Sequence, residues 1–193
     1  MEGFRLNSIQ KTGGGRYLRN YELNYTNKKG DPKVYEMVSY RDIGGPEDLG
    51  SRLGGAVIVA LKGDRLLLLR EFRMAVNRYV YNLCAGFKEE GETLEDCVRR
   101  ELYEESGLKL IRIRKMLKPA FAAVSLSDVS NQLVIADVDG EISDHSEDDE
   151  LIEAAFYNKE EVGRLVAEET FTARAQFIAY AFSHGFFDAK ENL

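Results

Sequence analysis

The chain has 193 residues, of which 44% are hydrophobic, and carries a formal net charge of −7 with a pI near 5.1. This length suits one generous domain, or one domain with a small appendage, and the apolar content suffices for a core. Proteins that bind nucleic-acid backbones usually show a basic stripe or patch, so the acidic balance argues against a nucleic-acid partner.

Neither a membrane nor an oxidising compartment is indicated. The longest strictly apolar run, Ala56 to Leu61, falls far short of the roughly 20 residues of a membrane span, and residues 1–16 lack a hydrophobic signal core. The two cysteines, Cys84 and Cys97, make neither a disulfide framework nor a zinc site. We therefore expect a cytoplasmic protein.

The first fifty residues predict β-structure. Tyr17–Thr26 and Lys33–Asp42 are rich in aromatic and β-branched residues and flank the sequence NKKGDP, which predicts a hairpin with its turn at Gly30-Asp31. Residues 44–55 hold five glycines and one proline and form the best internal boundary. We therefore expect an N-terminal β-appendage at residues 1–43 and a second domain at 44–193.

The second part predicts a mixed sheet with a few helices, an α/β (α+β) sandwich. Its expected elements, in chain order, are two apolar strands around 62–64, a third strand at 78–86, a helix from Thr93 to Gly107, strands at 108–117, 132–140 and 151–157, a helix after Asn158, and a helix from Thr172 to Ser183. Thr93 with Asp96 resembles a capping box, and Gly107 supplies a C-terminal stop.

The helix after Thr93 carries an unusual number of carboxylates. At about 100° per residue, Leu94, Cys97, Val98 and Leu102 define the face toward the core. Glu101 and Glu105 fall inside that face, whereas Glu104 lies at its edge and Arg99 and Tyr103 lie opposite. Such a helix ordinarily has a solvated acidic face, but the helical periodicity favours carboxylates that point toward the core.

Inward carboxylates need a compensating charge, because two of them about 4 Å apart repel by roughly 4 kcal/mol at an effective dielectric of 20. Protonation, an arginine or a divalent cation can supply it. We expect Arg100 to satisfy one partner but not the cluster, and all-oxygen ligands suit magnesium, with manganese possible. The carbonyl of Ala85 is a further candidate ligand, and Gly86 and Gly91 would let the chain turn there, although they could also make a turn without a ligand.

The sequence from Gly86 to Leu108 resembles a complete Nudix box: Gly86, five residues, Glu92, seven residues, Arg100-Glu101, Leu102, one residue, Glu104-Glu105, one residue, Gly107 and Leu108. The resemblance implies the Nudix α/β/α sandwich and magnesium-dependent hydrolysis of a nucleoside diphosphate linked to another moiety. By position, Glu101 and Glu105 resemble metal ligands and Glu104 a further ligand or helper. Glu92 and Arg100 would orient the helix and its carboxylates.

Residues outside the box resemble the ADP-ribose and sugar-nucleotide pyrophosphatases. The triplet Glu71-Phe72-Arg73 stands where that subgroup has a QYR-like triplet, which implies that Arg73 binds the diphosphate; pairing with a strand neighbour is the plainer alternative. NLCAG at 82–86 replaces the usual ELPAG, so Asn82 and Cys84 depart from the pattern. That departure bears on the sugar or distal group.

The subgroup also implies a base site and a homodimer. Tyr17 and Tyr35 stand where aromatic residues of an N-terminal sheet enclose the purine, often across a swapped dimer, and Glu36 could accept a hydrogen bond from an exocyclic amine. Strand tyrosines that only pack are the alternative. Stacking on an aromatic ring is worth about 1–3 kcal/mol per base.

The acidic segment 143–150 stands where the resemblance implies a residue that helps to bind metal or takes a proton from the attacking water. Related enzymes place a glutamate before the strand that precedes the last helices, and Glu150 stands there, with Asp149 and Glu147 as substitutes. A solvated charge run is the alternative.

The expected activity is hydrolysis of ADP-ribose or a related nucleoside diphosphate sugar. Two alternatives stay open: a Nudix hydrolase of another nucleotide class, such as a GDP-mannose-like sugar or a dinucleoside polyphosphate, and a non-catalytic nucleotide-sugar sensor.

Overall fold

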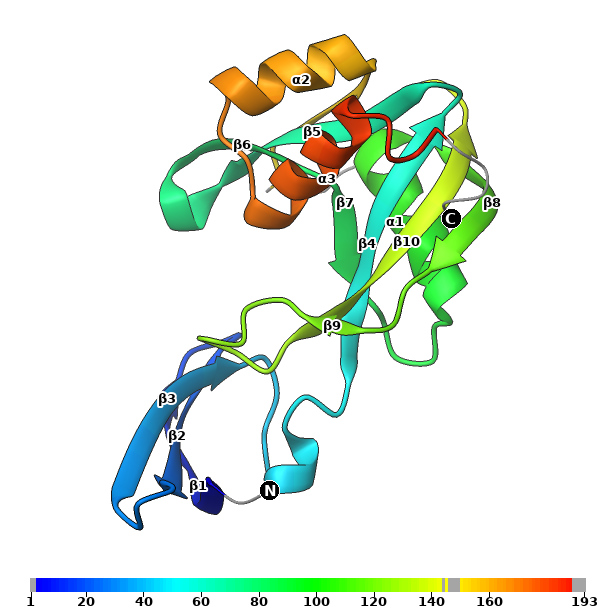
Figure 1. Cartoon of the computed structure of the whole chain (residues 1–193). Helices are drawn as coiled ribbons and strands as arrows, with labels where there is room; N and C mark the ends of the chain where they lie inside the picture. Colours follow the sequence, from blue (N-terminus) through cyan, green and yellow to red (C-terminus); the bar gives the residue numbers. More distant parts are fainter. Residues whose placement is uncertain (1–2, 144, 146–149, 189–193) are drawn as a thin grey trace. The chain divides into compact units, whose positions relative to one another are not determined.

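The computed structural model describes residues 3–143, 145 and 150–188. It contains two compact units (Figure 1). The first comprises residues 1–54 and 119–131, and the second comprises residues 55–118 and 132–193. This grouping differs from the division expected at residue 43, because residues 119–131 return to the first unit from far along the chain.

The first unit is built on a three-stranded antiparallel sheet in the order β1-β2-β3. Strand β1 spans Arg5–Gly14, β2 spans Arg19–Thr26 and β3 spans Pro32–Ser39. The predicted hairpin is confirmed, because Thr26 of β2 pairs with Pro32 of β3. Strand β1 was not predicted; most of its residues are polar and exposed, and two register shifts interrupt its pairing with β2.

Two shorter elements complete the first unit. The 3-10 turn η1 spans Pro46–Asp48. Strand β9 (Ala120–Phe121) pairs with Ser130 and Asn131, the first two residues of β10 (Ser130–Asp139). A small core of Tyr21, Leu23, Met37 and Ile43 lies under the sheet.

The second unit contains the larger sheet, with the order β11-β5-β4-β10-β8; β6 pairs with β5 and β7 pairs with β4. The strands are β4 (Leu53–Lys62), β5 (Arg65–Arg73), β6 (Arg78–Asn82), β7 (Cys84–Phe87), β8 (Lys109–Met116), β10 (Ser130–Asp139) and β11 (Ile152–Tyr157), and the 3-10 turn η2 (Met74–Val76) follows β5. The single strand expected at 78–86 is divided at Leu83, and its halves pair with different neighbours.

Helices cover both faces of the larger sheet (Figure 1). Helix α1 (Leu94–Ser106) packs on one face, and α2 (Lys159–Glu168) and α3 (Ala173–Ser183) pack on the other. Along β4, Ala56, Ile58 and Ala60 point to the α1 side and Val57, Val59 and Leu61 to the α2–α3 side. Burial on both faces explains why β4 and β5 are continuous apolar runs.

The ends of the helices follow their local sequence. Thr93 and Asp96 form the expected capping box of α1, and Gly107 ends the helix with φ of 70°. Asn158 and Glu161 form a second capping box at α2. The predicted α/β/α sandwich with a separate antiparallel β-structure is confirmed. No helix in the described part of the chain is long and apolar enough to cross a membrane.

Strands β4 and β7 approach so closely that Gly55 has no room for a side chain. A Cβ atom at Gly55 would overlap the carbonyl oxygen of Gly86, which is backbone and cannot rotate away. We predict that Gly55→Ala lowers the free energy of unfolding by about 1–3 kcal/mol, as overpacking does.

Denaturant unfolding monitored by circular dichroism measures this change. Gly163→Ala is the matched control, because a Cβ atom there makes only an ordinary 3.8 Å contact with Ser183 and alanine favours a helix by about 0.5–1 kcal/mol. Equal stability of the two variants would contradict the prediction.

Candidate active site

The carboxylates of helix α1 point in the directions that helical periodicity predicts. Glu101 is only 8% exposed and lies in the face that also buries Cys97, Val98 and Leu102, whereas Tyr103 is 49% exposed. Burial of a carboxylate is costly without a compensating partner. The partners around α1 therefore decide what the helix can bind.

Arg100 is the main partner of these carboxylates. Its guanidinium forms a two-pronged contact with Glu92 at 3.0 and 3.1 Å and also donates to Glu101 at 2.7 Å, to Glu104 at 3.0 Å and to the carbonyl of Phe87 at 2.9 Å. The expectation that Arg100 satisfies a single carboxylate is therefore wrong. The rigid fork of five N–H donors lets one arginine hold three glutamates.

Glu105 has no arginine partner among the described residues. Its Oε2 accepts a hydrogen bond from the backbone N–H of Ala85 at 3.0 Å, and the Cys84 thiol also bonds to the carboxyl group. The pKa of Glu105 is raised to about 8, chiefly by burial and further by the charges of Glu101 and Glu71, against the opposing effect of these hydrogen bonds. These surroundings favour the protonated form of Glu105 when no cation is bound.

Glu101 lies against Gly86 of β7. A Cβ atom at Gly86 would overlap the Glu101 carboxyl group, so glycine makes room for this side chain. Gly86 is thus required for close approach and not for the turn expected from the sequence, whereas Gly91, with φ of 81°, does form the turn. Burial raises the pKa of Glu101, and the charges of Glu104 and Glu150 act in the same direction against the lowering effect of Arg100.

A cavity of about 400 Å³ lies in the same unit, where β5 ends and β11 begins. Glu71, Arg73 and Glu150 line it together. The charge of Glu150 acts on Glu101 and that of Glu71 acts on Glu105, so the cavity and the α1 carboxylates share one electrostatic environment. Arg73 also lies 3.6 Å from its strand neighbour Glu71, which was the alternative partner considered for it.

Glu71 is the site residue that the sequence analysis missed. It is 5% exposed, and its carboxylate accepts a 2.7 Å hydrogen bond from Asn82. Its position could have identified it, because Glu71 is the single acidic residue of β5 and stands two positions before Arg73, on the same side of the strand.

The donor atoms present suit a hard divalent cation. No three acidic, histidine or cysteine side chains of the described residues converge closely enough to hold a metal by themselves. The carboxylates of Glu101, which is buried, and Glu105, which is partly buried, lie beside β7, which carries the Ala85 carbonyl. Such oxygen atoms are the ligands that magnesium and manganese prefer. Glu105 has no cationic partner among the described residues, and an added cation would stabilise its charged form.

The expected base-binding residues belong to the first unit and do not meet. Tyr17, 64% exposed, lies in the turn before β2, whereas Tyr35 pairs with Leu23, four residues beyond Arg19 along the ladder. At about 3.4 Å per residue the ladder separates them by roughly 14 Å or more. Tyr35 lines an apolar cavity of about 530 Å³ with Phe4, Tyr25 and Phe121, and its hydroxyl donates to the carbonyl of Val124.

Glu36 is exposed and pairs in register with Glu22, so it projects into solvent beside another carboxylate. Of the three candidates for a general base, Glu150 lines the cavity described above. Asp149 and Glu147 lie outside the described residues.

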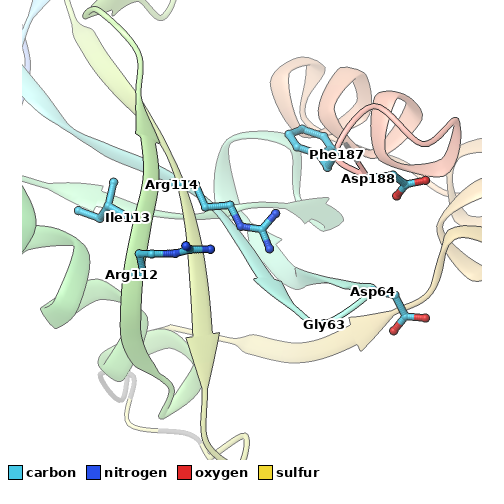
Figure 2. A pocket seen from close by; sticks show the side chains of 7 residues that line it. All are labelled: Gly63, Asp64, Arg112, Ile113, Arg114, Phe187 and Asp188. Atoms are coloured by element: carbon cyan, nitrogen blue, oxygen red, sulfur yellow. The ribbon is translucent and has the colours of Figure 1, made fainter. Parts of the chain in front are cut away.

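A third cavity, of about 490 Å³, is lined by no residue of α1 (Figure 2). Arg112 and Arg114 project from β8 on the side where Phe187 and Asp188 lie. Both guanidinium groups donate to Asp137, whose pKa is lowered chiefly by the bond from Arg114. Their charge is engaged with that carboxylate, so this cavity offers no comparable site.

Comparison with known proteins relates the part of the chain that holds α1 and β5 to a known family. The profile of the family described as NUDIX domain matches residues 52–181. NAD-capped RNA hydrolase NudC of Vibrio parahaemolyticus is 43% identical over 63 residues, which cover 33% of this chain and 24% of that protein. The NudC of Photobacterium profundum is 44% identical over 64 residues, which cover 33% of this chain and 23% of that protein. The chain thus spans about a quarter of the length of these relatives.

A solved structure shares the whole fold. The structure titled "Crystal structure of ADP compounds hydrolase" superposes with a TM-score of 0.78 at 18% identity and covers 100% of this chain and 98% of that one. At this identity the likeness concerns the fold.

The raised pKa of Glu105 makes stability depend on pH. An unfolded glutamate has a pKa near 4.3, so between about pH 4.5 and pH 8 the unfolded chain releases a proton that the folded chain keeps. Without metal, we predict that stability falls as pH rises through this window, by at most about 1.4 kcal/mol per pH unit for this group.

Thermal unfolding in EDTA from pH 5 to pH 9 tests this prediction. Glu105→Gln should lack this part of the slope, and Glu153→Gln, which changes an exposed carboxylate paired with Arg70, should keep it. Parallel pH profiles for wild type and Glu105→Gln would contradict the assignment.

Proposed function

The chain belongs to the NUDIX domain family, and on this premise we propose that it hydrolyses the diphosphate bond of ADP-ribose or a related nucleoside diphosphate sugar. The products would be a nucleoside monophosphate and a sugar phosphate. The observation that carries the proposal is the pair of inward α1 carboxylates, the buried Glu101 and the partly buried Glu105, which share an electrostatic environment with a cavity containing Arg73.

Glu101, Glu105 and the carbonyl of Ala85 would hold the magnesium ion, with Glu104 as a further ligand and manganese as a substitute. A bound divalent cation supplies neutralisation of the diphosphate charge and a more acidic water molecule. The protein's part is to keep these oxygens in place: Arg100 grips Glu101 and Glu104 and is itself fixed by Glu92 and the carbonyl of Phe87.

Arg73 would bind the diphosphate. Its guanidinium side chain is 58% exposed and lines the cavity, and an arginine fork matches two phosphate oxygens. Glu150 would take the proton from the attacking water, because it lines the same cavity and its charge reaches Glu101. Water then forms the new P–O bond, and the bridging oxygen leaves with the other phosphate.

Base recognition is proposed for the first unit. Tyr17 or Tyr35 would stack on the base and Glu36 would accept a hydrogen bond from it, and the aromatic cavity beside Tyr35 supports this role. Because Tyr17 and Tyr35 lie apart along the hairpin, enclosing one base between them requires two chains. This requirement supports a homodimer formed through the N-terminal strands. We propose in addition that the protein is cytoplasmic.

One observation favours a second candidate substrate. The relatives that match over 63–64 residues are NAD-capped RNA hydrolases, so a dinucleotide diphosphate such as NAD belongs in the substrate panel. GDP-mannose and a dinucleoside polyphosphate represent the other nucleotide classes, and binding without turnover would indicate a sensor.

We predict that Glu105→Gln lowers turnover of ADP-ribose by roughly 100-fold or more while the protein stays folded, because it removes a negatively charged ligand of the ion that would neutralise the diphosphate. AMP release in magnesium measures turnover, and circular dichroism checks the fold. EDTA should abolish wild-type activity and magnesium should restore it.

Glu153→Gln is the matched control and should keep full activity, because its exposed carboxylate pairs with Arg70 outside the site. Full activity of Glu105→Gln, or wild-type activity in EDTA, would refute the assigned role.

A further inference from the structure

Glu71 is a buried carboxylate that the proposed mechanism does not use. It follows Arg70 in β5, is 5% exposed and lines the cavity that also holds Arg73 and Glu150. Its negative charge acts on Glu105 and helps to raise the pKa of that group. A charge buried beside other carboxylates opposes folding, so stability does not explain its presence.

A chain of hydrogen bonds fixes the Glu71 carboxylate. The hydroxyl of Thr172 donates to Oδ1 of Asn82 at 2.7 Å, and Nδ2 of Asn82 donates to Oε1 of Glu71 at 2.7 Å. An ionised carboxylate only accepts hydrogen bonds, so these two partners define which way the Asn82 amide points. Thr172 precedes α3, but its side chain makes no capping bond there, which leaves the hydroxyl for Asn82.

The second oxygen of Glu71 faces Arg73. The distance from Oε2 to a terminal nitrogen of Arg73 is 3.6 Å, which is close enough for an ion pair but too long for a good hydrogen bond. Among the described residues, Arg73 makes no other ion pair. Its N–H donors are thus kept near the cavity and remain available for a ligand.

We propose that Glu71 is a positioning residue, which holds Arg73 at the cavity in the free enzyme so that its guanidinium is already oriented when a diphosphate binds. The Thr172–Asn82 pair fixes Glu71 for this purpose. A long arginine side chain loses much rotamer freedom on binding, and restricting it beforehand lowers that cost. The inference rests on the proposed function, which gives Arg73 its ligand.

Glu71→Gln tests the proposal with little change in shape. The amide oxygen of glutamine can still accept from Asn82, but the charge that attracts Arg73 is gone. We expect the Kd for ADP-ribose, measured by calorimetry in EDTA, and the KM in magnesium to rise about 3- to 10-fold. The kcat should change less than twofold, and the thermal midpoint should stay equal or rise because a buried charge is removed.

Arg73→Ala makes the test specific. If Glu71 acts through Arg73, then Glu71→Gln has no further effect on Kd or KM in the Arg73→Ala background. Thr172→Val, which removes only the hydroxyl, should weaken binding in the same direction but less. Glu153→Gln, on the neighbouring strand β11, should match wild type in every measurement.

The outcomes separate this inference from the proposed function. If the wild type hydrolyses ADP-ribose but Glu71→Gln leaves Kd and KM unchanged, the inference is overturned and the proposed function stands. The same conclusion follows if Glu71→Gln weakens binding equally with and without Arg73→Ala. If the wild type binds ADP-ribose in EDTA but does not hydrolyse it in magnesium, and Glu71→Gln weakens that binding only when Arg73 is present, the inference is supported and the proposed function is overturned. A wild type that neither binds nor hydrolyses ADP-ribose overturns both.

Discussion

Among the glutamates around α1, one carboxyl group has no arginine partner in the described structure. Arg100 can hold Glu92, Glu101 and Glu104 because its donors radiate in one plane, but the described structure gives Glu105 only a backbone N–H and a thiol. Burial above all, together with the charges of Glu101 and Glu71, raises the pKa of Glu105. A cation bound at Glu105 would displace a proton there and would break no ion pair of that residue.

The same arrangement depends on close packing of the backbone. Gly55 lets β4 approach β7, and Gly86 leaves room for the Glu101 carboxyl group against that strand. Strand β7 also supplies the N–H of Ala85 that holds Glu105. One short strand therefore contacts both inward carboxylates, so a distortion of the β4–β7 pair would disturb the site as well as the fold.

The sequence predicts what local chemistry decides. The bounds of α1 follow from Thr93 and Gly107, and the inward direction of Glu101 follows from helical periodicity. The three contacts of Arg100 could not be predicted, because they depend on side-chain rotamers and on where β7 packs. Strand β1 has no apolar alternation to reveal it, and the return of residues 119–131 to the first unit is a long-range contact that composition does not record.

Asn82 shows how a departure from a sequence pattern acquires a physical meaning. In the ELPAG pattern the carboxylate belongs to the position of Asn82, and in the QYR-like triplet the amide belongs to the position of Glu71. Here the amide stands at the first of these positions and the carboxylate at the second, and the two groups meet in a 2.7 Å hydrogen bond between β6 and β5. The negative charge therefore belongs to the strand that carries Arg73, two residues away. Because the contacts of Glu71 are with Arg73 and Asn82, the departure should affect how phosphate is held before it affects the choice of base.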